Sequence, residues 1–279
     1  MLRSELKVGA EAPFQIVHIT DTHLTYADDR DGERKTALAK ARARFFPQAE
    51  EVLQKACGIS REQQAVIMHT GDLIDFVSQA NLERVKRFMN EYDCFMAAGN
   101  HEFSLYVGEA KEDAAYRSQS LAKVQAVFCN DIRMSARVIN GVNFVALDNG
   151  YYLFEQEQLE FVKNEVLKGF PIVLMMHTPL FEQNLFDELM GTMGECRVEK
   201  PCAYLAGVPE EQMKDYSAGR FEQQKADSIT LKAIEYFKSE PLIKAILAGH
   251  VHRTMDARLT KDIPQIITST TDIRLITVA

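Results

Sequence analysis

A short apolar stretch that runs directly into Thr-Gly-Asp constrains this chain more than any other feature. Residues 64–68, Gln-Ala-Val-Ile-Met, have the composition of a short buried β-strand, and His69 to Asp75 follow at once. The turn places the carboxylate of Asp72 at the carboxyl end of that strand, where ligand sites form in open α/β sheets. Taken alone, Asp72 is explained more simply as a turn residue, so its meaning depends on the rest of the chain.

The same layout recurs at four further positions. Mainly apolar, strand-like segments occupy residues 14–19, 92–97, 171–176 and 242–247. The polar side chains that follow them are Asp21, His23, Asn100, His101, His177, His250 and His252. Five of the seven histidines of the chain therefore fall just after strands. Chance could supply one or two such placements but hardly all of them, so we expect these stretches to converge on one site.

Two of these stretches carry metal-ligating side chains two residues apart. Asp21 and His23 form one such pair, and His250 and His252 form the other. Residues i and i+2 of an extended segment face the same side, so both side chains of a pair can coordinate one ion. His18 lies inside its strand and is interpreted as a packed histidine without a role in the site.

The mixture of imidazoles, carboxylates and one amide suits two borderline or hard divalent ions. A single structural zinc ion is usually four-coordinate and would not need eight candidate ligands. Two adjacent cations can clamp the attacking and leaving oxygens of an in-line displacement, and a water between them loses a proton to become the nucleophile. The protein then needs one general acid, worth roughly 10²–10⁴-fold, and His101 fits that need.

Composition limits the classes of partner and the cellular setting. The 279 residues are 46% hydrophobic, enough for a large core, and carry a net charge of -8, which disfavours binding of long nucleic acids. Five cysteines without a Cys-x-x-Cys pair indicate free thiols, although Cys196 and Cys202 could pair or bind metal. No signal-peptide core or apolar run of ~20 residues occurs, so we expect a soluble cytoplasmic protein without a membrane partner.

The remaining pattern predicts alternating helices and strands. Helices are expected near 35–57 (ended by Gly58), 79–91, 110–126, 155–168 and 224–238, a hairpin at 138–147, and strands near 254–260, 264–268 and 273–278. Arg42 and Arg44 are expected on the solvent side of their helix, with a phosphate-binding role as the less favoured alternative. Residues 180–223 show no clean period; they form either an insertion that covers the site or a peripheral subdomain.

The order of these blocks resembles that of the calcineurin-like metallophosphoesterase superfamily. The matching blocks are Asp21-x-His23, Gly71-Asp72-x-x-Asp75, Gly99-Asn100-His101-Glu102, His177 and Gly249-His250-x-His252. The resemblance implies an α/β fold, a four-layer α/β/β/α sandwich with two mixed β-sheets. We expect a single domain over residues 1–279, with the insertion at about 180–223 able to cap the active site.

The resemblance also implies a role for each site residue. One ion is expected on Asp21, His23 and His252. The other is expected on Asn100, His177 and His250, with Asp72 bridging the two. His101 would not bind metal but would stabilise the transition state or protonate the leaving oxygen, and Asp75 would orient His101 by hydrogen bonding. The ions, divalent or trivalent, are Mn, Fe, Zn, Ni or Mg.

Departures from related branches narrow the expected substrate. Branches resembling the Ser/Thr protein phosphatases carry phosphate-binding arginines where this chain has Phe76-Val77 and Ala98. Purple acid phosphatases carry a metal-binding tyrosine where this chain has Asp75. Both branches are therefore disfavoured. The Gly-Asn-His-Glu, His-Thr-Pro and Gly-His-x-His blocks are similar to those of bacterial phosphodiesterases of the cyclic-nucleotide class. This resemblance implies a phosphodiesterase acting on small diesters or nucleotides, with a phosphomonoesterase or a nuclease as alternatives. A non-catalytic interaction module is the least favoured interpretation, and the oligomeric state is open.

Overall fold

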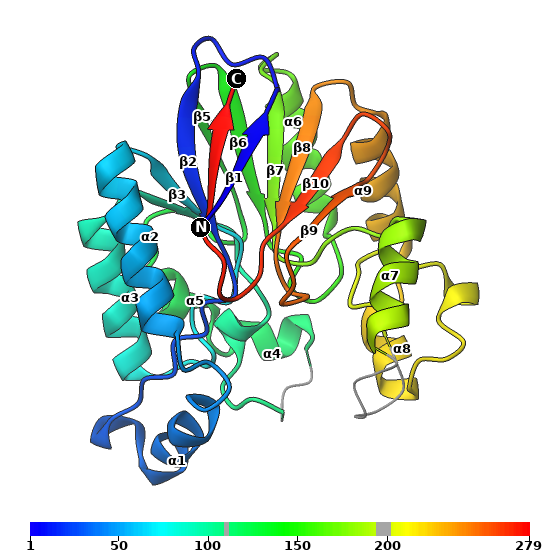
Figure 1. Ribbon diagram of the computed structural model, residues 1–279. Helices are drawn as coiled ribbons and strands as arrows, with labels where there is room; N and C mark the ends of the chain where they lie inside the picture. Colours follow the sequence, from blue (N-terminus) through cyan, green and yellow to red (C-terminus); the bar gives the residue numbers. More distant parts are fainter. Residues whose placement is uncertain (109–111, 194–201) are drawn as a thin grey trace.

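Two β-sheets form the centre of the molecule (Figure 1). The computed structural model describes residues 1–108, 112–193 and 202–279. The first sheet has the order β1 (Leu2–Leu6), β11 (Arg274–Val278), β2 (Phe14–Ile19), β3 (Val66–His69) and β4 (Cys94–Met96). The second has the order β5 (Met134–Ile139), β6 (Val142–Leu147), β7 (Ile172–Met176), β8 (Ile243–Ala248), β10 (Pro264–Ile267) and β9 (Met255–Arg258). Each sheet contains parallel and antiparallel pairs, so both are mixed, as predicted.

The two sheets share an apolar layer that both of them line. Val173 and Met175 of β7 belong to the same buried cluster as Met68 of β3 and Phe95 of β4. Leu174, the residue between them, belongs instead to the cluster on the outer side of the second sheet. Because successive side chains of a strand point to opposite faces, a strand buried on both faces must be apolar throughout. This explains the continuous apolar runs in the sequence.

Helices cover the outer face of each sheet, which completes a four-layer sandwich. Helices α2 (Ala49–Gln63) and α3 (Gln79–Glu91) flank the first sheet, and α6 (Gln156–Val166) and α9 (Ser228–Ser239) flank the second (Figure 1). The predicted α/β/β/α fold is thereby confirmed. The parallel strands β2, β3, β7 and β8 end at the same side of the sandwich, and the loops that follow them carry the candidate site residues.

The helix predicted at 35–57 is in fact two helices, so that prediction is wrong in its extent. Helix α1 (Glu33–Arg42) ends before residues 43–48, and α2 begins at Ala49. Pro47 lies in the break, where its missing N–H and fixed ring oppose a continuous helix. Gly58 does not end α2, which continues to Gln63 and is closed by Gln64 in the left-handed conformation.

Other segments differ from expectation in smaller ways. Strand β1 has no counterpart in the prediction, and it pairs in parallel with β11 at the edge of the first sheet. The helix predicted at 110–126 is represented by α4 (Ala114–Ser118) and α5 (Leu121–Gln125). The segment 180–223 contains α7 (Gln183–Met193), and α8 (Ala218–Gln224) begins within it. The described residues also include three short 3-10 helices, at Asp29–Asp31, His101–Phe103 and Glu210–Gln212.

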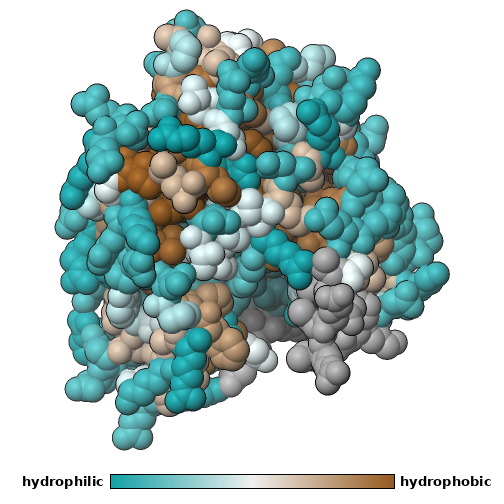
Figure 2. All heavy atoms as spheres, viewed as in Figure 1, coloured by the Kyte–Doolittle hydropathy of each residue, from teal (hydrophilic) through white to brown (hydrophobic). Residues whose placement is uncertain are grey.

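The face seen in Figure 2 is mostly hydrophilic, apart from an apolar patch in its upper left part. Large apolar side chains are exposed singly at Met1, Phe45, Leu167 and Leu231. Isolated exposed residues of this kind are common on water-soluble surfaces. Within the described ranges, every helix is too short or too polar to cross a lipid bilayer.

Candidate metal centre

The loops after the strands turn sharply at the residues that the sequence nominates as ligands. Asp21, His23, Asp72, His250 and His252 all have positive φ angles, of 50°, 50°, 56°, 69° and 53°. A non-glycine residue in this region is strained by ~1–3 kcal/mol, and such strain gathers at functional sites. The strain lets each loop leave its strand at once and aim its side chains at one point.

Glycines let these loops approach one another. A Cβ atom on Gly99 would collide with the carboxylate and backbone nitrogen of Asp72. A Cβ atom on Gly249 would collide with Thr20 and with the carboxylate of Asp21. The glycines of the Gly-Asn-His-Glu and Gly-His-x-His blocks are therefore required by packing against the carboxylates.

Asp21, His23 and His252 form the first group of facing ligand atoms. The Nε2 atoms of His23 and His252 lie 3.1 Å apart, and Asp21 Oδ1 lies 3.8 Å and 3.3 Å from them. Asp21 Oδ2 accepts hydrogen bonds from Thr20 Oγ1 at 2.7 Å and from the His250 amide at 2.8 Å. Asp21 Oδ1 is buried and has no hydrogen-bond partner in the described part of the chain.

Asp72, His177 and His250 form the second group. His177 Nε2 lies 3.0 Å from His250 Nδ1 and 3.1 Å from Asp72 Oδ2. His177 Nδ1 donates to the Thr70 carbonyl at 2.8 Å, which leaves the Nε2 lone pair facing the centre. Asp72 Oδ2 also lies 3.6 Å from His23 Nε2, so this one oxygen stands between the two groups.

Asn100 lines the same cavity as Asp72 and His250, and its amide carries a further candidate ligand oxygen. Its Nδ2 donates to Glu112 Oε1 at 2.9 Å, so the amide is fixed with Oδ1 on the other side. Asn100 Oδ1 is buried without a hydrogen-bond partner among the described residues, like Asp21 Oδ1. Asp21 Oδ1 lies beside the imidazole nitrogens of His23 and His252, where a cation would satisfy it. With the two groups of facing ligand atoms, the donor set fits two metal ions.

The charges of the centre are strongly coupled. Burial by itself would raise the pKa of Asp72, but His177 and His101 lower it well below its ordinary value. Burial would lower the pKa of His177, but Asp72 and Asp21 raise it to about 9. The pocket therefore holds ionised carboxylates away from water, the condition under which bound cations are held tightly.

His101 and Asp75 lie together at the edge of the centre. His101 Nδ1 lies 2.7 Å from the Asp75 carbonyl oxygen and 3.2 Å from its Oδ1. Asp75 Oδ1 is also 2.9 Å from His23 Nδ1. Arg42 forms an ion pair with the same carboxylate, with Nε and Oδ2 2.6 Å apart. The expectation that Arg42 lies on the solvent side is therefore wrong. Arg44 is exposed, as expected. A third cluster of His23, Asp75 and His101 is thus held by Arg42 and hydrogen bonds.

Three structural contacts of the centre were missed by the sequence analysis. Glu102 accepts hydrogen bonds from the amides of Asp72, Leu73 and Gly99, each at 2.7 Å, and fastens the β3 loop to the β4 loop. The position of Glu102 in the Gly-Asn-His-Glu block is the sequence feature that could have indicated a role for it in the site. The Tyr152 hydroxyl lies 2.8 Å from His250 Nε2, and the Phe46 ring stacks on His23 at 4.0 Å. Neither aromatic residue has a sequence signal.

Other predictions concern residues outside the centre. His18 is buried within β2 and lies 2.9 Å from Thr70 Oγ1 and 3.0 Å from Thr268 Oγ1, so it is a packed histidine as expected. The expected free thiols are confirmed for four cysteines: Cys57, Cys94, Cys129 and Cys202. Cys196 lies outside the described residues.

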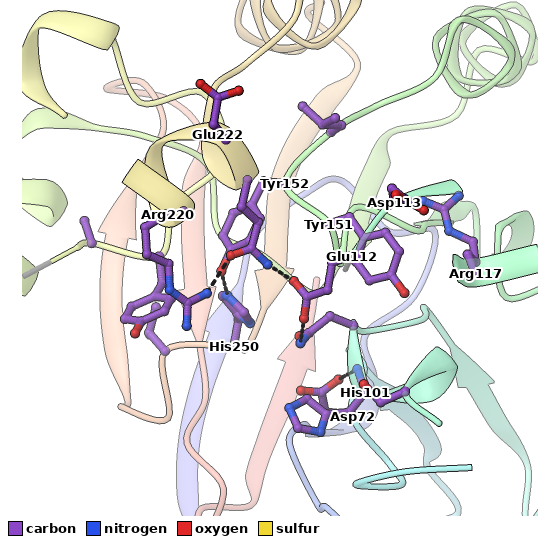
Figure 3. A pocket seen from close by; sticks show the side chains of 18 of the residues that line it. Asp72, His101, Glu112, Asp113, Arg117, Tyr151, Tyr152, Arg220, Glu222 and His250 are labelled. Atoms are coloured by element: carbon purple, nitrogen blue, oxygen red, sulfur yellow. Dashed lines mark hydrogen bonds between the residues drawn. The ribbon is translucent and has the colours of Figure 1, made fainter. Parts of the chain in front are cut away.

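A cavity of about 1130 Å³ opens beside the centre (Figure 3). Asp72, Asn100, His101, His250 and His252 line its floor. Its walls include Glu112, Arg117, Tyr151, Tyr152 and Phe154, together with Leu189, Ala203, Tyr204, Arg220 and Gln223 from the 180–223 segment. Site residues from three of the five predicted stretches therefore line this cavity, and Asp21, His23 and His177 lie beside them in the two ligand groups.

The chain belongs to the calcineurin-like phosphoesterase family, whose model matches residues 14–254. It is accordingly a metal-dependent phosphoesterase, a hydrolase of phosphoric esters. The predicted resemblance is confirmed. A search of curated proteins finds no match.

A comparison with solved structures finds proteins from several organisms. A dimetal phosphatase from Danio rerio has a TM-score of 0.50 and 15% identity, over 92% of this chain and 88% of that chain. Phosphopantetheinyl hydrolase from Mycobacterium tuberculosis has a TM-score of 0.45 and 10% identity, over 96% and 90%. A 5'-nucleotidase from Candida albicans has a TM-score of 0.42 and 15% identity, over 92% and 46%. At such low identity, the likeness to the Danio rerio protein shows a shared fold.

Proposed function

We propose that this protein hydrolyses small phosphodiesters or nucleotides at a centre of two metal ions. The observation that carries the proposal is the pair of ligand groups joined by Asp72 Oδ2, on the floor of one cavity. Asp21, His23 and His252 would hold one ion, Asn100, His177 and His250 the other, and Asp72 both. Two such ions supply charge stabilisation and an activated water for in-line displacement at phosphorus.

His101 is proposed as the general acid for the leaving oxygen. Asp75 engages its Nδ1 through the carbonyl and the carboxylate, so the ring orientation is fixed and Nε2 is left for the cavity. A proton held at Nε2 can then pass to the departing ester oxygen. Asp75 acts through His101 and is a positioning residue.

The size of the cavity supports a substrate with two substituents on phosphorus. Tyr151, Tyr152 and Phe154 line the cavity together with residues of the 180–223 segment. Aromatic walls of this kind stack on planar groups such as nucleobases. That residues 180–223 cap the site remains a prediction, which their place in the cavity lining supports. The net charge of -8 disfavours long nucleic acids.

Hydrolysis of two chromogenic esters tests the proposal. We expect the Mn²⁺-loaded protein to hydrolyse bis-p-nitrophenyl phosphate with a higher kcat/KM than p-nitrophenyl phosphate. The reverse order would replace the diesterase with the phosphomonoesterase alternative. Cleavage of single-stranded or duplex DNA in a gel assay would favour the nuclease. Turnover of neither ester with Mn²⁺, Fe²⁺, Zn²⁺, Ni²⁺ or Mg²⁺ would contradict the enzyme assignment.

A further inference from the structure

Three arginines line the cavity, and they differ in how their charge is balanced. Arg117 lies 3.0 Å from Glu155 Oε1 and 3.4 Å from Asp148 Oδ2, so two carboxylates neutralise it. Arg220 forms no ion pair with any residue that the structure describes. Arg253 also has none in the described ranges, and neither a hydrogen bond nor a ring contact there fixes its guanidinium.

Arg220 is held in position although, among the described residues, no carboxylate pairs with it directly and Glu112 acts on it from beyond Gln223. Its Nη1 donates to Gln223 Oε1 at 2.6 Å, and its guanidinium carbon lies 5.0 Å from the centre of the Tyr204 ring. Gln223 in turn donates to Glu112, the residue that fixes Asn100. The guanidinium is therefore oriented by helix α8, while most of its N–H donors lack a partner in the described part of the molecule.

Arg220 is oriented beside the second ligand group. The Tyr204 ring that it contacts lies 5.9 Å from the His250 ring. In Figure 3, Arg220 lies on the same side of the cavity as Tyr152 and His250, and His101 lies on the other side. A group seated over the metal ligands would thus meet the general acid on one flank and the guanidinium on the other.

We propose that Arg220 binds a non-bridging oxygen of the substrate's phosphoryl group, an inference that rests on the proposed function. A half-buried cation without a direct ion-pair partner is costly, and an anionic oxygen in the cavity offsets that cost. The planar guanidinium matches the geometry of phosphoryl oxygens. The positions 76, 77 and 98 hold no cation, because Phe76, Val77 and Ala98 are buried and apolar. The 180–223 segment thereby supplies the arginine that those positions lack.

Binding of inorganic phosphate tests this assignment without turnover. Calorimetric titration of the Mn²⁺-loaded protein is expected to show a Kd for phosphate that is about 10- to 100-fold higher in Arg220→Gln than in wild type, as for loss of a charged hydrogen bond. Phosphate should inhibit ester hydrolysis more weakly by the same factor. The matched control is Lys225→Gln, which removes a charge from the residue just after α8, where Lys225 pairs with Glu210 outside the cavity lining.

Two measurements keep a negative result interpretable. Bound Mn²⁺ and the thermal midpoint without phosphate should match wild type in Arg220→Gln, which separates phosphate binding from folding and metal loading. A phosphate Kd within about twofold of wild type in that variant, or an equal loss in Lys225→Gln, would overturn the inference. Failure of the wild type to hydrolyse either chromogenic ester would instead contradict the proposed function.

Discussion

Arg42 and Asp75 form a two-point ion pair, with Nε 2.6 Å from Oδ2 and Nη2 2.9 Å from Oδ1. The same Asp75 carboxylate contacts His23 and His101. Helix α1, which belongs to none of the sequence blocks of the family, therefore fixes a residue that touches both a proposed metal ligand and the proposed general acid. The positive charge of Arg42 also offsets the negative charge of the buried Asp75 carboxylate.

Replacement of Arg42 by Gln is expected to lower kcat/KM by about tenfold, equivalent to ~1.4 kcal/mol of transition-state stabilisation. The carboxylate of Asp75 would lose its fixed orientation, and His101 would sample positions that are unsuited to proton transfer. Steady-state hydrolysis of bis-p-nitrophenyl phosphate measures the effect. Arg44→Gln, at an exposed position close by, serves as the control and should retain wild-type kinetics. Equal losses in both variants would argue against a specific role for the ion pair.

Tyr152→Phe is expected to weaken binding of the metal ion at His250 by about 10- to 100-fold, the usual cost of removing a hydrogen bond to a ligating imidazole. The hydroxyl lies 2.8 Å from His250 Nε2 and so fixes which ring nitrogen faces the centre. Mn²⁺ titration calorimetry measures the loss. Tyr151→Phe is the matched control, because the buried Tyr151 hydroxyl has no hydrogen-bond partner in the described chain. Unchanged affinity in Tyr152→Phe would refute the assignment.

Removal of metal is expected to lower the thermal midpoint by roughly 5–10 °C, because ions at about 100 times Kd stabilise the folded state by ~2.7 kcal/mol. Without cations, Asp21 Oδ1 stays buried without a hydrogen-bond partner among the described residues, and only the neighbouring histidines offset the charge of the buried Asp72. Scanning fluorimetry with EDTA and with Mn²⁺ measures the difference. In Asp72→Asn, which keeps the shape but removes the shared charge, the Mn²⁺-dependent shift should shrink by at least half. The same shift in both proteins would place the stabilising ions elsewhere.

Alkylation should distinguish the cysteines by burial. Burial raises the pKa of Cys57 to about 11 and that of Cys94 well above its ordinary value, and Cys129 is exposed. Because the thiolate is the reactive form, we expect iodoacetamide at pH 8 to modify Cys129 more than about tenfold faster than Cys57 or Cys94. Peptide mass spectrometry of native and urea-unfolded protein measures the rates. Comparable rates in the native protein would contradict the burial of Cys57 on α2 and of Cys94 on β4.

Much of the sheet architecture could be predicted because strands buried on both faces are uniformly apolar. The helix boundaries were harder, since one apolar face continues across the break between α1 and α2 and only Pro47 marks it. Strand β1 was missed because an edge strand alternates exposed and partly buried residues, a weak pattern over five residues. Helix α7 was missed because its apolar residues were scattered among glycines and prolines of the flanking loops.

The order and spacing of Asp, His and Asn after successive strands determined the family and nominated the proposed ligands, because strand ends of a parallel sheet meet at one edge. Tertiary structure alone decided which atoms face inward and what holds them. Arg42, Tyr152 and Arg220 come from segments without a motif, and their contacts with Asp75, His250 and Tyr204 depend on how helices and loops pack in three dimensions. Contacts between residues far apart in the sequence produce no periodic pattern along the chain, so they can be identified only in the folded structure.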